Sequence, residues 1–220
     1  MGAVLKILVV DDHTLVREGL CQVLKGLSEN VEVLEAPNCA IAFELAALHP
    51  HLDLILLDYH LPDMNGLQAL DIFGDKHPEL PVVMLSGSVN PQIMRQVIAK
   101  GAAGFITKAG KSNDLLNALR LVLDGEIYIP PELDAEAALY PPLDDSAPLP
   151  SPGFTQRQEA VLDLMLEGRT NREISLQLNL AEETIKTHVT AILRGFNVKN
   201  RVQAVLAARL HGYGKSTTFP

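Results

Sequence analysis

LKILVVDD at residues 5–12 and LDLILLD at residues 52–58 are the two stretches that decide the fold. Residues 7–10 and 54–57 are apolar at every position, with no polar alternation. A strand of this kind is typical of a parallel sheet whose two faces are both covered by helices. Each stretch ends in aspartate, so a charged group follows directly after a buried strand.

Two further apolar runs, PVVMLS and GFITK, also end in a polar residue, at Ser86 and Lys108. If all four runs are neighbouring parallel strands, their carboxyl ends lie at one edge of one sheet, where α/β folds place their ligands. Carboxylates from Asp11, Asp12 and Asp58, a hydroxyl and an ammonium would then meet at that edge.

Strand and helix patterns alternate with short connections from Lys6 to about Asp124. The strand-like segments LKILVV, VEVLEA, LDLILL, PVVML and GFITK are each followed by an amphipathic segment of helical period. Five repeats of this kind predict an α/β fold, a five-stranded doubly wound parallel sheet with helices on both faces.

A second, all-helical part follows a linker. Residues 129–152 hold half of the prolines and no basic residue, which predicts an extended acidic spacer. After Gly153, four short segments show helical periodicity, and two begin with capping-box spacing, Thr155 to Gln158 and Thr170 to Glu173. Tight turns between them predict a helix-turn-helix module. We therefore expect domains at residues 1–128 and 153–220 with a linker between them.

The net charge of −9 conceals an asymmetry. Residues 1–130 carry 9 Lys or Arg against 16 Asp or Glu, whereas residues 153–220 carry 9 against 6. A polyanion such as nucleic acid would therefore bind to the C-terminal part. With no long uncharged apolar run and no leader-type sequence, we expect a cytoplasmic protein that does not contact membranes. The two cysteines, Cys21 and Cys39, have no metal-binding spacing and are expected to be reduced.

The predicted strand endings suit magnesium-assisted phosphoryl transfer. Mg²⁺ prefers oxygen ligands, and Asp11 or Asp12 together with Asp58 can supply them. Phosphoryl transfer needs an in-line nucleophile and cations on the peripheral oxygens, and the Lys108 ammonium is such a cation. The hydroxyl of Ser86 could bond the transferred group.

Residues 4–125 resemble the receiver domain of two-component response regulators, a flavodoxin-like fold. The resemblance rests on Asp11-Asp12, on Asp58 within LLDYHLPDMNG, on Ser86 within MLSG, and on Phe105 and Lys108 within GAAGFITKA. It implies that Asp58 accepts a phosphoryl group from a sensor histidine kinase or a small phosphodonor. It also implies that Asp11, Asp12 and the His60 backbone carbonyl help to bind Mg²⁺, and that Ser86 and Phe105 change position on phosphorylation.

An aspartate-nucleophile phosphatase would use similar groups but needs a second aspartate two residues after the nucleophile. His13 and His60 occupy the two positions in question, so we expect no enzymatic activity and a phosphorylated aspartate instead. The side chains of both histidines are interpreted as helix-opening and loop residues, because no histidine spacing typical of a metal site is present.

Residues 153–205 resemble the LuxR-type helix-turn-helix of NarL/FixJ response regulators, in polar as well as apolar positions. The matching residues are Thr155, Arg157, Glu159, Leu162, Gly168, Asn171, Glu173, Ile174, Leu178, Thr184, Lys186, His188, Val198, Asn200 and Arg201. The resemblance implies promoter DNA as the partner, with a homodimer formed on phosphorylation.

The helix beginning near Glu182 is the expected recognition helix, because an exposed helix face fits the major groove. The residues expected to contact DNA are Lys186, Thr187, Thr190, Arg194, Lys199 and Arg201. Three departures from the family pattern weaken this module. Ala181 replaces the usual cap at a cost of about 1 kcal/mol, Thr190 replaces a frequent basic residue, and Gly195 costs roughly 1 kcal/mol relative to Ala.

We therefore predict a DNA-binding response regulator in which phosphorylation of Asp58 controls transcription. The alternative is a phosphorylation-switched regulator whose helical domain binds a protein partner. The two differ in salt dependence, because DNA binding releases counterions and weakens steeply with ionic strength.

Overall fold

The computed structural model describes residues 4–88, 90–124, 126–130, 153–198 and 200–214. Its N-terminal part is a five-stranded sheet in which every neighbouring pair is parallel, in the order β2-β1-β3-β4-β5. The strands are β1 (Leu5–Val10), β2 (Val31–Ala36), β3 (Leu54–Asp58), β4 (Val82–Ser86) and β5 (Gly104–Thr107). Every residue of β3 and β4 is buried. The predicted doubly wound α/β fold is confirmed.

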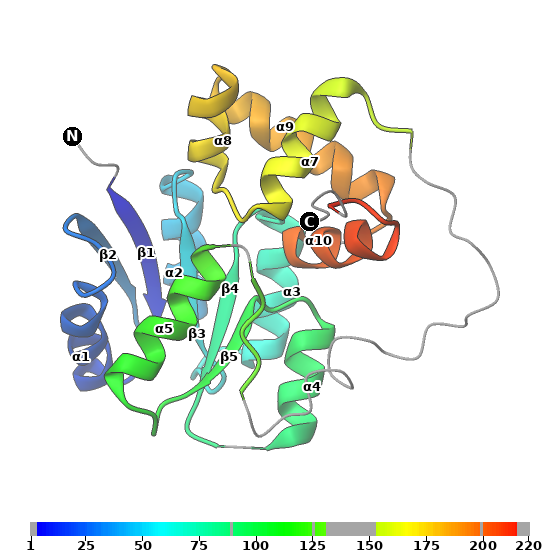
Figure 1. Ribbon diagram of the computed structural model, residues 1–220. Coiled ribbons are helices and arrows are strands. Elements are labelled where there is room, and N and C mark those ends of the chain that lie inside the picture. The colour runs from blue at the N-terminus through cyan, green and yellow to red at the C-terminus, as the bar shows by residue number, and fades with distance from the viewer. Residues whose placement is uncertain (1–3, 89, 125, 131–152, 199, 215–220) are drawn as a thin grey trace, which may run out of the picture.

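Five helices cover the two faces of the sheet (Figure 1). One face packs against α2 (Cys39–Leu48), α3 (Gly66–Lys76) and α4 (Pro91–Ala99), with Phe73 and Met94 in the buried cluster. The other face packs against α1 (Thr14–Leu24) and α5 (Ser112–Leu123), through Leu24, Leu119 and their neighbours. Cys39 is buried and Cys21 is half-buried.

The C-terminal part is all-helical, with α7 (Gln156–Leu166), α8 (Asn171–Leu178), α9 (Glu182–Gly195) and α10 (Arg201–Leu210). Their apolar faces form a separate core. Both predicted capping boxes are present, at Thr155 with Gln158 and at Thr170 with Glu173. The α9 helix begins after Ala181 without a side-chain cap. Residues 131–152 of the predicted linker lie outside the described residues, so the domain boundaries stay a prediction.

The helical domain packs against loops at the amino ends of the strands (Figure 1). The Arg201 amide donates to the Pro78 carbonyl at 2.8 Å, and the Lys186 ammonium donates to the Pro50 carbonyl at 2.7 Å. Gly168 has a φ of +82°, and a Cβ there would lie 1.5 Å from the Asp124 carbonyl oxygen. Only glycine fits this left-handed position and this close approach.

No helix within the described ranges combines the length and the apolar character that a bilayer crossing requires.

Candidate phosphorylation site and DNA-binding helix

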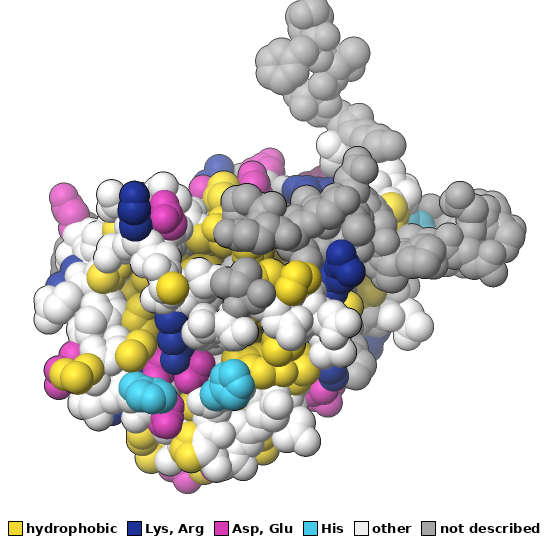
Figure 2. All heavy atoms as spheres, turned by 90° about the horizontal axis from the view of Figure 1, so that it is seen from below, with side chains coloured by type: hydrophobic (Ala, Val, Ile, Leu, Met, Phe, Trp, Pro, Cys, Tyr) yellow, Lys and Arg dark blue, Asp and Glu magenta, His cyan; other side chains and the backbone are white. Residues whose placement is uncertain are grey.

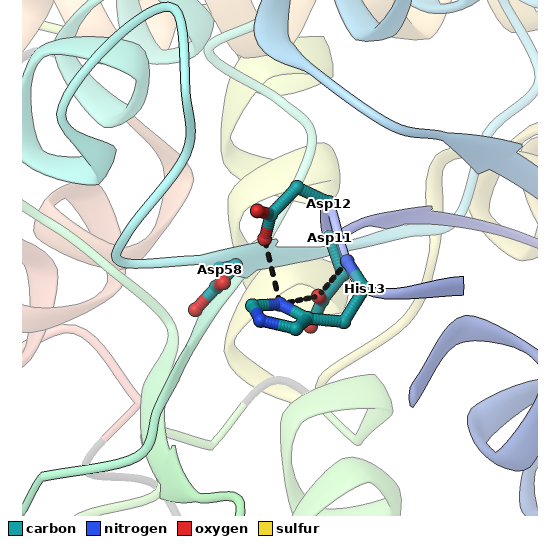
Figure 3. A group of neighbouring side chains, drawn as sticks. All are labelled: Asp11, Asp12, His13 and Asp58. Atoms are coloured by element: carbon teal, nitrogen blue, oxygen red, sulfur yellow. Dashed lines mark hydrogen bonds and ion pairs between the residues drawn. The ribbon is translucent and has the colours of Figure 1, made fainter. Parts of the chain in front are cut away.

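Three carboxylates converge at the carboxyl ends of β1 and β3 (Figure 3). Asp11 and Asp12 follow β1, and Asp58 is the last residue of β3. The ligand atoms of Asp11, Asp12, His13 and Asp58 all lie within 4.8 Å of one another. Asp11 is fully buried and Asp58 is 2% exposed, whereas Asp12 is exposed. Figure 2 looks onto this edge of the sheet and shows acidic, basic and histidine side chains gathered there.

Lys108 is the cation of this pocket. Its Nζ lies 2.6 Å from Asp11 Oδ2 and 2.8 Å from Asp58 Oδ2. Burial lowers the pKa of Lys108, but hydrogen bonds and charge from the two carboxylates outweigh it and raise that pKa. Burial raises the pKa of Asp58 and Asp11 adds to the rise, while Lys108 opposes it. A single ammonium thus forms ion pairs with two buried carboxylates.

The pocket fits a divalent cation. Asp11 Oδ2 is buried, and its polar neighbour is the Lys108 ammonium, which also pairs with Asp58. Crowded carboxylates that share one lysine leave negative charge uncompensated, and oxygen donors of this kind suit hard cations.

The other predicted receiver residues lie on β4, β5 and the β3–α3 loop. Ser86 ends β4 and is 1% exposed, and its Oγ accepts from the Ser88 amide at 3.2 Å. The Ser86 carbonyl accepts from the Lys108 amide at 2.8 Å, which joins the two strand ends. Phe105 is fully buried in β5. His60 follows Asp58 in the β3–α3 loop, and its backbone donates to the Asp58 carboxyl.

The β3–α3 loop is held close to Asp58 by short backbone contacts. The Gly66 amide donates to the Tyr59 carbonyl at 3.0 Å, and a Cβ at Gly66 would lie 2.8 Å from the Asp58 carbonyl oxygen. The carboxylate of Asp63 accepts from the amides of Cys39 and Ala40 at 3.1 and 3.0 Å, which ties the loop to the start of α2.

Two residues of the site were missed from the sequence. Asp63 is one, because its amide partners lie 23 and 24 residues away in the chain. Arg17 is the other, and its Nη1 donates to the Asp11 carbonyl at 2.7 Å. Its position one turn into the helix after the acidic pair is the signal that could have found it.

The α9 helix presents part of the predicted DNA-binding surface. Its apolar row, which consists of Ile185, Val189, Ile192 and Leu193, is buried. Thr187 and Arg194 are exposed, and Thr190 is half-buried. Lys186 is 17% exposed because its ammonium contacts the receiver domain at Pro50. Lys199 lies outside the described residues.

The expectation that Arg201 lies near DNA phosphates is not supported. Its side chain is buried at the start of α10, and its guanidinium donates to the backbone carbonyls of Arg169 and Met165 and to Asn171 Oδ1. Burial lowers the pKa of Arg201 to about 10. These hydrogen bonds stabilise the α7–α8 connection. They occupy the guanidinium, so that it is not available to a phosphate.

Known proteins match both parts of the chain. Residues 7–120 match the family "Response regulator receiver domain", and residues 152–208 match the family "Bacterial regulatory proteins, luxR family". The glycerol metabolism activator of Pseudomonas putida is 38% identical, over 92% of this chain and 94% of its own length. The nitrate/nitrite response regulator protein NarL of Escherichia coli strain K12 is 32% identical, over 91% and 93%.

A solved structure agrees with these sequence matches. The crystal structure of a LuxR family DNA-binding response regulator from Silicibacter pomeroyi aligns with a TM-score of 0.53 at 30% identity, over 59% of this chain and 99% of that one. The fold and the acidic pocket define a receiver domain joined to a helix-turn-helix domain. The chain belongs to the response regulator family, in the class of transcription regulators with a LuxR-type output domain.

Proposed function

We propose that Asp58 accepts a phosphoryl group in a Mg²⁺-dependent reaction and that its phosphorylation controls promoter binding by α9. The observation that carries this proposal is the pairing of two buried carboxylates with one lysine at the carboxyl edge of the sheet. Asp11, Asp12, Asp58 and the His60 carbonyl would hold Mg²⁺. When bound, the ion supplies positive charge to the phosphoryl oxygens.

The residues of this chain have distinct roles in the transfer. An Asp58 oxygen attacks phosphorus in line as the bond to the leaving group of the donor breaks. Lys108 stays beside the new phosphoryl group and offsets its charge. Ser86 moves toward the phosphoryl group and donates its hydroxyl hydrogen to a phosphoryl oxygen. Phe105, on the neighbouring strand β5, changes position in response. The donor is a sensor histidine kinase or a small phosphodonor.

The packing of α9 on the receiver supports control by masking. Lys186 is bound to the Pro50 carbonyl, and Glu182 Oε2 lies 3.0 Å from His51 Nδ1. A recognition helix held by these contacts cannot present Lys186 to DNA. Phosphorylation at the opposite edge would favour release of α9, and a homodimer would then link two half-site contacts.

Phosphorylation is expected to raise promoter affinity about tenfold or more, the usual range of allosteric coupling. Gel shifts of the full chain with promoter fragments, with and without a small phosphodonor and Mg²⁺, measure the effect. The control is Asp58→Asn, whose affinity should not respond. Binding should weaken steeply with salt. A phosphorylated protein that retards no DNA, or a salt-insensitive complex, would instead favour a protein partner for the helical domain.

Masking predicts that His51→Glu raises DNA affinity without phosphorylation. A glutamate there would face the Glu182 carboxylate, but the pair is partly exposed, so we expect about a threefold to fivefold gain. His49→Glu is the matched control, since it makes the same charge change and its side chain has no polar contact with the described helical domain. Equal affinities for the two variants would contradict masking through this contact.

A further inference from the structure

Glu183 lies in line with the residues of α9 that we expect to contact DNA. Glu183, Thr187, Thr190 and Arg194 follow one another at intervals of three or four residues, which places them on one side of the helix. The buried apolar row of α9 lies on another side. Glu183 belongs to the first turn, and its side chain is 75% exposed. The amino-terminal residues of a recognition helix are the ones that contact base edges in helix-turn-helix complexes.

The two glutamates of this first turn have different surroundings. Glu182 contacts the receiver domain, where its Oε2 lies 3.0 Å from His51 Nδ1. Glu183 instead lies beside a lysine of its own helix, with its Oε1 3.4 Å from Lys186 Nζ. An ion pair of this kind at the surface contributes little free energy. Both groups can therefore exchange each other for hydrogen-bond partners on DNA.

Charge and hydrogen bonding restrict what Glu183 can contact on DNA. Phosphates repel a carboxylate, so an acidic residue on this side of α9 suits DNA best where it faces a hydrogen-bond donor of a base. In the major groove, glutamate accepts from the N4 amino group of cytosine, and lysine donates to O6 and N7 of guanine. A carboxylate and an ammonium 3.4 Å apart on one helix match these neighbouring groups of a single G·C pair.

An A·T pair matches the same two side chains less well. It also presents an amino group, N6 of adenine, but the acceptor beside that group is thymine O4, whose neighbour is a methyl group. The ammonium of Lys186 would then find one acceptor instead of the two that guanine offers.

We propose that Glu183 determines part of the DNA sequence preference, by accepting a hydrogen bond from cytosine N4 while Lys186 donates to the guanine of the same pair. This inference rests on the proposed promoter binding by α9 and adds a specificity to it. Lys186 must first leave the Pro50 carbonyl, which it contacts at 2.7 Å. The G·C preference is therefore a property of the released helix.

Selection of binding sites from random duplex DNA by the phosphorylated full chain tests the proposal. We expect the wild type to select one G·C pair in each half-site and to bind about tenfold less tightly when that pair is replaced by A·T. Glu183→Ala should lower this preference to about threefold or less. Glu183→Gln should shift the selection toward A·T, because glutamine pairs with N6 and N7 of adenine.

Glu159→Ala is the matched control. Glu159 is also an exposed glutamate in the first turn of a helix, but that helix is α7 and not the recognition helix. Acidic residues in a first turn stabilise a helix through its dipole, and both alanine variants lose that effect. Glu159→Ala should therefore lower stability as Glu183→Ala does, and should select the same DNA as the wild type. Urea unfolding of both variants measures the shared effect.

Two results would overturn the proposal. One is unchanged base selection in Glu183→Ala and Glu183→Gln, which would leave Glu183 with a role in helix stability alone. The other is a uniform gain in affinity of Glu183→Ala for all DNA, which would mean that the carboxylate only repels phosphates. In both cases, sequence-selective binding by the wild type would still support promoter binding. A phosphorylated protein that enriches no DNA would contradict the proposed function, and this inference with it.

Discussion

Replacing Asp58 by asparagine is expected to abolish labelling by a phosphodonor and, at neutral pH, to stabilise the receiver domain. Labelling is lost because the amide cannot attack phosphorus. Stability rises because burial and the charge of Asp11 raise the pKa of Asp58 above its ordinary value, despite Lys108. The ionised form of this carboxyl is therefore disfavoured by the fold.

The pH dependence follows from the sign of that shift. A carboxyl whose pKa is raised in the folded state stabilises the fold below its unfolded pKa, and that contribution is lost as pH rises through the folded pKa. The gain in stability from Asp58→Asn is thus present at neutral pH and disappears in acid, where the wild-type carboxyl is protonated. Urea unfolding at pH 7.5 and in acid, together with phosphodonor labelling, measures both effects.

Asp63 provides a control of opposite sign. Burial raises the pKa of Asp63, but hydrogen bonds from the Cys39 and Ala40 amides outweigh it and lower that pKa below its ordinary value. Its stabilising effect is present above the unfolded pKa and lost as pH falls through the folded pKa. Asp63→Asn should therefore destabilise the protein at neutral pH.

Two results would contradict the assignment of Asp58 as the phosphorylated residue. One is labelling of the Asp58→Asn protein by a phosphodonor, and the other is a loss of stability in that variant at pH 7.5.

The receiver site was predictable from the sequence because it depends on local pattern and topology. Continuous apolar runs specify buried parallel strands, and parallel strands bring their carboxyl ends to one edge. Asp11, Asp58 and Lys108 meet for that reason alone. The distances between these groups also show how their charges are paired, because one ammonium forms ion pairs with two carboxylates.

Arg201 was misjudged because its role depends on contacts that local pattern does not specify. His13, in contrast, precedes the first residue of α1 as predicted, and its amide donates to Asp11 Oδ1. Arg201 was placed near phosphates by resemblance, but the carbonyls that bind its guanidinium lie 32 and 36 residues earlier. The same holds between the domains, because the close approach of Gly168 to Asp124 does not follow from local pattern.

Arg201→Met is expected to destabilise the helical domain by about 3 kcal/mol. Methionine keeps an apolar stem, but the buried Met165 carbonyl and the partly buried Arg169 carbonyl lose their charged donor. Buried acceptors left without a partner cost about 1–3 kcal/mol each. Arg201→Lys should be intermediate, because a single ammonium cannot span both carbonyls as a planar fork does.

Arg194→Met is the matched control, since it removes the same group from an exposed position on α9. It should leave stability unchanged and weaken DNA binding, with a salt slope lower by about one if Arg194 contacts a phosphate. Hydrogen exchange of α7 and α8 and DNA binding across a salt series measure the two effects separately. If Arg201→Met left exchange in α7 and α8 unchanged and lowered the salt slope, Arg201 would be a phosphate contact. Faster exchange with the wild-type salt slope in the remaining folded protein is the result expected from a guanidinium that holds the α7–α8 connection.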